Sequence, residues 1–170
     1  MRKSILCSFN ADIICLGETH LFPNDQDIEL TNDYVFRDHR RKSRNWASGR
    51  TFGGVCFFIR KTLFNTYNIT DVDKSFDGIY ALKFEHKQSG YSFIIINTYL
   101  PPENSIWGRD ATRFYSHVLS IIYTMQDVNA IYMIGDVNSC IGNMNDYIEG
   151  IDDIRERSII DHVKTNMVKL

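Results

Sequence analysis

The chain has 170 residues, a hydrophobic fraction of 44% and a formal net charge of −2. This length suits one domain and is short for two, and the many Phe and Tyr residues argue against a disordered chain. The charge gives no sign of the basic surplus that nucleic-acid-binding proteins usually show. No apolar stretch reaches membrane-spanning length and no signal peptide is evident, so we expect no membrane partner.

The four cysteines, Cys7, Cys15, Cys56 and Cys140, form no CxxC pair, which argues against a zinc site. Cys15 and Cys56 lie inside apolar runs and are expected to be small buried hydrophobes. We therefore expect free thiols in a reducing, intracellular compartment, either the nucleus or the cytoplasm.

Apolar runs interrupted by glycine predict the elements of the first half. Residues 3–10 predict a short helix, and residues 11–19 a buried strand that ends at glycine and glutamate. Residues 20–50 are polar and predict a loop, in which 37–50 is the one strongly basic stretch. Residues 53–63 predict a strand that is entered through two glycines.

The second half predicts two strands, a helix and a third strand. Residues 77–102 indicate a hairpin with its turn at 87–90, stopped by two prolines. The following helix could begin at Ser105 or Asp110, and its apolar stripe comprises Phe114, Val118, Ile121, Ile122 and Met125. Residues 130–134 predict another buried strand. Such an order favours a mixed, layered α/β (α+β) fold over a simple parallel βαβ array.

Polar residues stand where three of the predicted strands end. Glu18 follows the first strand, Tyr99 ends the hairpin, and Asp136 and Asn138 follow the last strand within IYMIGDVNS. Ligands gather at strand ends in layered α/β folds, and Mg²⁺ takes carboxylate, water and phosphate oxygens. A tyrosine can orient a phosphate oxygen, and an aspartate can activate water. The set therefore suits metal-assisted phosphodiester hydrolysis.

Each of these residues also has a purely structural interpretation. Glu18 can be the first exposed residue after a strand, and Tyr99 can serve packing. Asp136 and Asn138 are residue types that form turns. Singly, the structural interpretation is favoured for each, whereas their combination in this order favours a site.

The segments DIICLGETHL (12–21), GGVCFFIRK (53–61), IINTYLPP (95–102) and YMIGDVNSCIG (132–142) resemble the endonuclease/exonuclease/phosphatase superfamily. They are most similar to the apurinic-type endonuclease domain of non-LTR (LINE-like) retrotransposons. The resemblance implies a layered β-sandwich flanked by helices, Mg²⁺ or Mn²⁺ as cofactor, and DNA as partner. In a full-length element it also implies a reverse transcriptase domain on the same chain.

The resemblance implies a role for each of the four strand-end residues. Glu18 matches the glutamate that binds the metal, and Tyr99 the tyrosine that contacts the scissile phosphate. Asp136 matches the aspartate that orients or activates the water, and Asn138 the asparagine that holds the phosphate.

Two parts of the family pattern have no match in the chain. These are a first strand with an active-site asparagine and a C-terminal Ser-Asp-His segment. Asp161 and His162 fall in a helical pattern and are taken as a coincidence. We therefore expect residues 1–170 to be one partial domain, with an incomplete second sheet and impaired or absent catalysis.

Two other functions stay open on the sequence. One is a non-catalytic remnant or binding module, and the other is a phosphoinositide or lipid phosphatase of the same superfamily. Asn97 could assist the site. His39, His86 and His117 have no ligand spacing and are expected at solvated positions. The basic stretch at 37–50, with Trp46, could meet DNA or be a solvated loop.

Overall fold

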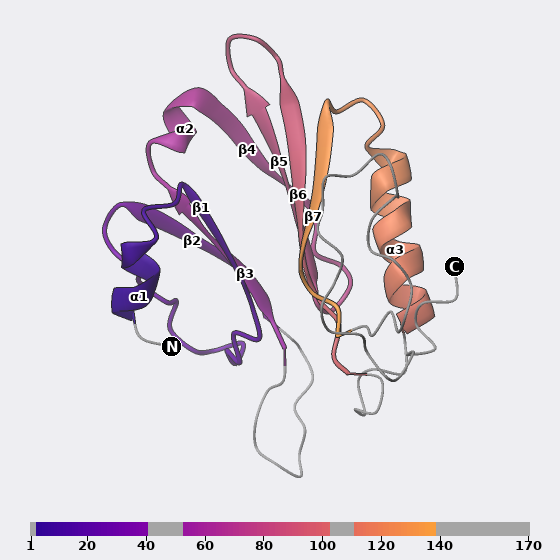
Figure 1. The fold of residues 1–170 in the computed structure, drawn as a ribbon, viewed down its shortest axis with the longest axis horizontal. Coiled ribbons are helices and arrows are strands. Elements are labelled where there is room, and N and C mark those ends of the chain that lie inside the picture. The colour runs from indigo at the N-terminus through magenta and orange to yellow at the C-terminus, as the bar shows by residue number, and fades with distance from the viewer. Residues whose placement is uncertain (1–2, 41–52, 103–110, 139–170) are drawn as a thin grey trace, which may run out of the picture.

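A computed structural model of the chain describes residues 3–40, 53–102 and 111–138. Two sheets lie face to face, and a helix lies on the outer side of each (Figure 1). The first sheet has the order β1–β3–β2, formed by Ile13–Gly17, Val55–Arg60 and Tyr34–His39. The second has the order β4–β5–β6–β7, formed by Tyr67–Asp73, Ile79–His86, Ser92–Tyr99 and Ala130–Asp136. The helices in these residues are α1 (Lys3–Ser8), α2 (Leu63–Thr66) and α3 (Ala111–Thr124).

The strand pairings confirm the expected α+β sandwich. The first sheet is antiparallel, and so are the pairs β4–β5 and β5–β6. β7 instead runs parallel to β6, because the chain crosses over through α3 between them. The C-terminal ends of β6 and β7 therefore lie at the same end of the second sheet.

Three apolar clusters among the described residues hold the layers together. The central cluster lies between the sheets and includes Phe57, Tyr80 and Phe84. A second cluster joins the outer face of the second sheet to α3, and a third joins the first sheet to α1. β3 contributes alternate residues to the central and α1 clusters, so it is apolar throughout its length. The free energy gained by burying the apolar faces of the sheets holds the two sheets together.

The elements with strong local patterns are confirmed. The hairpin of β5 and β6 and the strand β3 lie where the sequence predicts them, and α1 covers most of residues 3–10. α3 buries Phe114, Val118 and Ile121 against the second sheet. The expected caps Ser105 and Asp110, like the tail after residue 138, lie outside the described residues.

The prediction of a loop over residues 20–50 is wrong for β2. This strand pairs with β3 from Tyr34 to His39, and the Tyr34 hydroxyl donates a hydrogen bond to the Ala11 carbonyl at 2.5 Å. His39 is buried, not solvated, and its Nδ1 lies 2.9 Å from the Ile79 carbonyl of the other sheet. Pairing with β3 within the first sheet decides the first outcome, and the contact with the second sheet decides the second. The local sequence pattern contains neither interaction.

The burial predicted for two strands is also wrong. β7 exposes Tyr132, Met133 and Ile134 at 52%, 42% and 39%. It stands last in the second sheet among the described strands, so only β6 pairs with it there. β1 is likewise at a sheet edge and is mostly half-buried.

The described cysteines agree with the expected free thiols. Cys7 is exposed, Cys15 half-buried and Cys56 buried, and none of the three is in a disulfide. Burial raises the pKa of Cys15 and of Cys56 to about 12. Cys140 lies outside the described residues. Among the described helices, none is long and apolar enough to cross a membrane.

Candidate active site

The structure brings three of the four predicted site residues together at one end of the sandwich. The Tyr99 hydroxyl, at the end of β6, donates a hydrogen bond to Glu18 Oε1. Asp136, at the end of β7, is the direct register partner of Tyr99. β1, which leads into Glu18, contacts both β6 and β7 across the sandwich. Residues at the ends of three strands therefore lie together although they are far apart in the sequence.

The Tyr99 ring is held in place by its surroundings. It is 5% exposed and packs beside Gly17, where a side-chain carbon would stand 3.5 Å from the ring. Its backbone N–H donates to the Gly78 carbonyl at 2.8 Å. The ring is thus fixed in the core, while Glu18, which accepts from its hydroxyl, is exposed.

Unusual backbone conformations gather around these residues. In the described part of the chain, four non-glycine residues have positive φ, and three of them are Glu18 (50°), His20 (54°) and Asn138 (44°). Such conformations cost of order 1–3 kcal/mol each for residues other than glycine, somewhat less for asparagine. Hydrogen bonds from the N–H groups of Thr19 and His20 to Gly54 and Gly53 hold the first of these loops. Strain that is maintained in this way is typical of functional sites.

Asp136 and Asn138 also shape the turn that follows β7. The Asn138 backbone N–H donates to Asp136 Oδ1 at 2.8 Å, and Asn138 Nδ2 donates to the Leu100 carbonyl at 3.0 Å. The interpretation of both residues as turn formers is therefore confirmed. A chemical role for Asp136 would use its other carboxylate oxygen, Oδ2.

Gly135 allows β7 to approach β6 closely at this point. Its φ is 133°, and a Cβ there would stand 1.8 Å from the Thr98 carbonyl oxygen. No L-amino acid with a side chain fits this position without moving the strand. The glycine thus sets the position of Asp136 next to Tyr99.

Asn97 connects the two sheets in the core next to the site. Its side chain is 1% exposed, and Nδ2 donates to the carbonyls of Leu16 at 3.2 Å and Cys56 at 2.9 Å. One amide therefore joins β6 to both β1 and β3, just before Gly17. Its Oδ1 is buried and accepts no hydrogen bond from the described residues. The sequence indicated that Asn97 could assist the site but contained no signal for this cross-sheet contact.

The oxygen donors at this end suit a hard divalent cation. Glu18, Tyr99 and Asp136 offer carboxylate and hydroxyl oxygens, the donor class of Mg²⁺ and Mn²⁺ sites. Within residues 3–40, 53–102 and 111–138, no three His, Cys, Asp or Glu side chains are grouped as in an all-protein metal cage. Mg²⁺ is commonly held by one or two carboxylates together with water and substrate phosphate, so this small set fits.

The described part of the basic stretch is occupied by ion pairs. Arg37 NH1 lies 3.3 Å from Asp71 Oδ1, and Arg40 contacts both Asp27 and Asp38. These two arginines are thus largely neutralised by the protein itself. The rest of the stretch, with Trp46, lies outside the described residues, as do Asp161 and His162.

Comparisons with known proteins bear on the fold. No protein-family model and no curated protein sequence matches the chain. Among the solved structures that match, an AP endonuclease and a Nocturnin catalytic domain share the two-sheet sandwich described above.

The first of these structures is the AP endonuclease LMAP from Leishmania major, with a TM-score of 0.64 and 15% identity. The match covers 81% of this chain and 49% of that one. The second is the human Nocturnin catalytic domain with bound sulfate anion, with a TM-score of 0.52, 18% identity, and coverage of 81% and 56%. The chain thus spans about half the length of these structures, and at such identities the likeness concerns the fold.

Proposed function

We propose that the chain carries a site for divalent-metal-dependent hydrolysis of phosphodiester bonds, acting on DNA as an endonuclease of the retrotransposon type. The observation that supports it best is the hydrogen bond between Tyr99 and Glu18, with Asp136 as register neighbour of Tyr99. These residues lie at the end of a sandwich whose fold resembles that of an AP endonuclease. The retrotransposon type rests on the resemblance of the four sequence segments alone.

Each residue has one role in this proposal. Glu18 holds the cation, which would act as a Lewis acid on a phosphate oxygen and stabilise developing charge. The Tyr99 hydroxyl donates its hydrogen bond to the phosphate instead of to Glu18 and so orients the phosphate. Asp136 would accept a proton through Oδ2 as the water oxygen bonds to phosphorus and one phosphorus–ester oxygen bond breaks, and the released sugar oxygen would take a proton from solvent. Asn138 would exchange its hydrogen bond to Leu100 for one to the phosphate.

We further propose that residues 1–170 correspond to part of a longer domain of this kind. The match to about half of each solved structure supports this proposal. In a full-length element a reverse transcriptase domain would follow on the same chain. The site as described has no histidine matched to the family's Ser-Asp-His segment, so the expected turnover of this chain alone is slow or absent.

The test separates metal binding from turnover. Calorimetric titration of Mn²⁺ should give one binding event that Glu18→Gln weakens at least tenfold. The exposed Asp33, beside the start of β2, supplies a matched control, and Asp33→Asn should bind Mn²⁺ like the wild type. Any nicking of supercoiled plasmid over long incubation with Mn²⁺ should be lost in Asp136→Asn. Absence of Mn²⁺ binding at millimolar concentration, or binding indifferent to Glu18→Gln, would refute the proposal.

A second candidate is a non-catalytic binding module. It is favoured by the hydrogen bonds that occupy Asp136 Oδ1 and Asn138 Nδ2 in the turn. This function predicts DNA binding with no metal-dependent nicking and no effect of Asp136→Asn on affinity. A lipid or phosphoinositide phosphatase would instead release phosphate from a soluble inositol phosphate and leave DNA intact.

A further inference from the structure

Exposed apolar side chains of the described residues gather on one flank of the second sheet. Among these residues, eight large hydrophobic side chains are exposed, and five of them belong to α3 and β7: Leu119, Tyr123, Tyr132, Met133 and Ile134. Their exposed fractions run from 39% for Ile134 to 68% for Tyr123. Ile131 of β7 packs into the apolar cluster beneath α3, so the two elements are neighbours (Figure 1). Such a gathering on a protein surface is typical of an interaction site.

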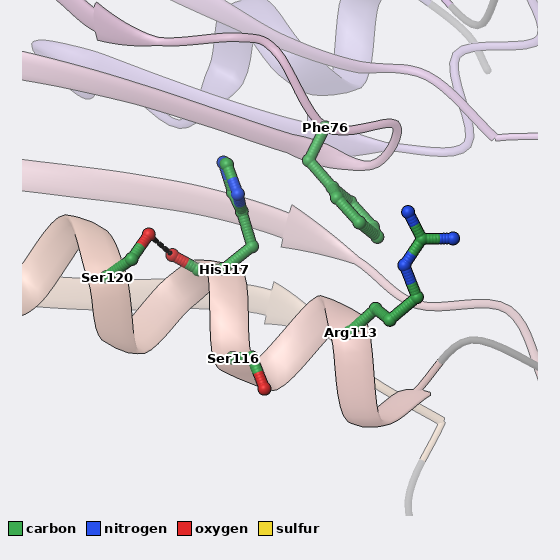
Figure 2. A pocket seen from close by; sticks show the side chains of 5 residues that line it. All are labelled: Phe76, Arg113, Ser116, His117 and Ser120. Atoms are coloured by element: carbon green, nitrogen blue, oxygen red, sulfur yellow. Dashed lines mark hydrogen bonds between the residues drawn. The ribbon is translucent and has the colours of Figure 1, made fainter.

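The two flanks of α3 differ in polarity. On the flank toward β4, His117 Nε2 lies 2.9 Å from Asp73 Oδ1, and a pocket of about 350 Å³ is present (Figure 2). This pocket is lined by Phe76, Arg113, Ser116, His117 and Ser120. Leu119 follows His117 by two residues, which is about 200° around a helix, so it lies on the opposite flank, toward β7. Tyr123 follows one turn later, so the flank toward β7 is the apolar one.

β7 presents an uncharged strand edge beside this flank. Residues 130–135 include no charged residue and no proline, which are the residues that natural sheets use to protect an edge. In the part of the chain that the structure describes, β6 stands on one side of β7 and no strand stands on the other. The Asp136 carbonyl accepts a hydrogen bond from Leu100, on the side of β6. Because backbone groups alternate in direction along a strand, the N–H and C=O groups of Ile131 and Met133 point to the other side.

The edge of β7 is complementary to itself. When two β7 strands pair antiparallel about a two-fold axis at Met133, Tyr132 of each copy stands opposite Ile134 of the other. Tyr132 lies on the face toward the first sheet, where its ring centroid is 6.1 Å from that of Phe93, and Ile134 lies on the same face. Pairs of an aromatic and a β-branched residue are favourable across strands.

The same pairing avoids contacts between like charges. Asp136 of one copy stands opposite Ala130 of the other, and the positions between them are uncharged. On the outer face of the sheet, Met133 lies on the axis and the Leu119 flank of α3 extends the contact beside it. Both faces of the joined strands are therefore apolar at the axis.

The exposed apolar area suits a small specific interface. Whole aromatic side chains cover about 150–250 Å² and aliphatic ones somewhat less, so the five side chains expose roughly 400 Å² per copy. The backbone edge of β7 adds to this area. Specific interfaces bury about 800 Å² per partner, and a total above about 1,000 Å² is sufficient. We expect a dissociation constant on the order of 10 µM for a contact at the lower end of this range.

We propose that two copies of the chain associate through β7 into a symmetric dimer, in which the two second sheets join into one sheet of eight strands, four from each copy. A second copy fits this edge because the strand complements itself in register, in apolar faces and in charge. The inference goes beyond the proposed function and does not depend on it, because neither Glu18 nor Tyr99 takes part in the contact.

The test is sedimentation equilibrium of the 170-residue chain between about 1 and 200 µM, where the wild type should show a monomer–dimer equilibrium. Met133→Lys places like charges on both sides of the axis and should raise the dissociation constant at least about tenfold. Met133→Glu should do the same. An equimolar mixture of the two variants should dimerise again, because position 133 of one copy stands opposite position 133 of the other. Circular dichroism should show that each variant is folded.

The matched control is Phe9→Lys, which also replaces an exposed apolar side chain by lysine. Phe9 is 61% exposed and follows α1, which lies on the outer side of the first sheet. This variant should dimerise like the wild type. Equal effects of Phe9→Lys and Met133→Lys, assembly beyond the dimer, or a mixture that stays monomeric would overturn the proposal. A monomeric wild type that Met133→Lys destabilises toward urea would show that another segment of the same chain covers the edge, and would overturn it as well.

Discussion

Replacing Asn97 by aspartate tests the cross-sheet contact behind the candidate site. The substitution keeps the size of the side chain but replaces the amide, whose Nδ2 faces the carbonyls of Leu16 and Cys56 at 3.2 and 2.9 Å. An ionised carboxylate would place negative charge against these two carbonyl oxygens, with no donor between them. The position is 1% exposed, so water cannot screen the repulsion.

The expected loss of stability depends on the protonation state of the new carboxyl group. An uncompensated buried charge typically costs about 3–5 kcal/mol, which is a large share of the total of about 5–15 kcal/mol for a domain. When protonated, the acid can still donate to one of the two carbonyls, and the expected cost falls to about 1–2 kcal/mol.

Burial raises the pKa of the new carboxyl in the folded state above its unfolded value of about 3.9. A raised folded pKa means that the contribution of the new carboxyl to stability is most favourable below pH 4 and becomes less favourable as pH rises through the folded pKa.

The assay is urea unfolding followed by circular dichroism at pH 4, 6 and 8, with the wild type measured beside Asn97→Asp. The quantity of interest is the difference in unfolding free energy between the two chains, which removes the pH dependence of all other groups. This difference should increase from pH 4 to pH 8. A difference below about 0.5 kcal/mol at pH 8, or one that does not change with pH, would show that the amide does not bridge the sheets.

Three other predictions concern glycine, cysteine and the Asp73–His117 pair. Gly135→Ala should lower the unfolding free energy by at least about 3 kcal/mol, because its Cβ would meet the Thr98 carbonyl at 1.8 Å. The control is Gly90→Ala, with a φ of 71° but nothing within 4 Å, which should cost only about 1 kcal/mol in the same urea unfolding assay. In a Cys7→Ser, Cys140→Ser chain, Ellman's reagent at pH 8 should label both remaining thiols far more slowly in the folded protein than in urea, since both folded pKa values are about 12. Labelling as fast in the folded protein as in urea would contradict the raised pKa of half-buried Cys15 and buried Cys56. Asp73 Oδ1 lies 2.9 Å from His117 Nε2, and Asp73→Asn should destabilise the chain by up to about 1 kcal/mol near pH 6. Because the Asp73 pKa is lowered in the folded state, the wild type should lose this advantage as pH falls below about 4. An effect unchanged at pH 2 would argue against the ion pair.

The parts of the fold that could be predicted from the sequence are those with a strong local pattern. The hairpin of β5 and β6 has a turn between two apolar runs, and α3 has apolar residues at helical spacing. β2 has no comparable signal, because residues 37–39 are polar and its stability comes from pairing with β3. The exposure of β7 could not be predicted either, since burial depends on which strands stand beside it in the sheet.

For the candidate site, the sequence supplied candidate residues but not their conformations. The resemblance selected Glu18, Tyr99, Asp136 and Asn138, and the structure brings the ends of their strands together. The positive φ of Glu18 had no sequence signal, whereas the residue types of Asp136 and Asn138 did indicate the turn after the last strand. The cross-sheet contacts of Asn97 and His39 also had no sequence signal, because a polar residue within a strand can face either solvent or the opposite sheet.

The hydrogen bond between Tyr99 and Glu18 joins residues 81 positions apart, and the contact from Asn97 to Leu16 spans the same separation. Contacts of such long range form late in folding, because the entropy of closing a long loop opposes them until the intervening elements have formed. The β5–β6 hairpin can form early, whereas the pairing of Tyr99 with Glu18 requires that both sheets have already docked. A probe placed at this pair would therefore report completion of folding, and any partly folded form of the chain would lack the site altogether.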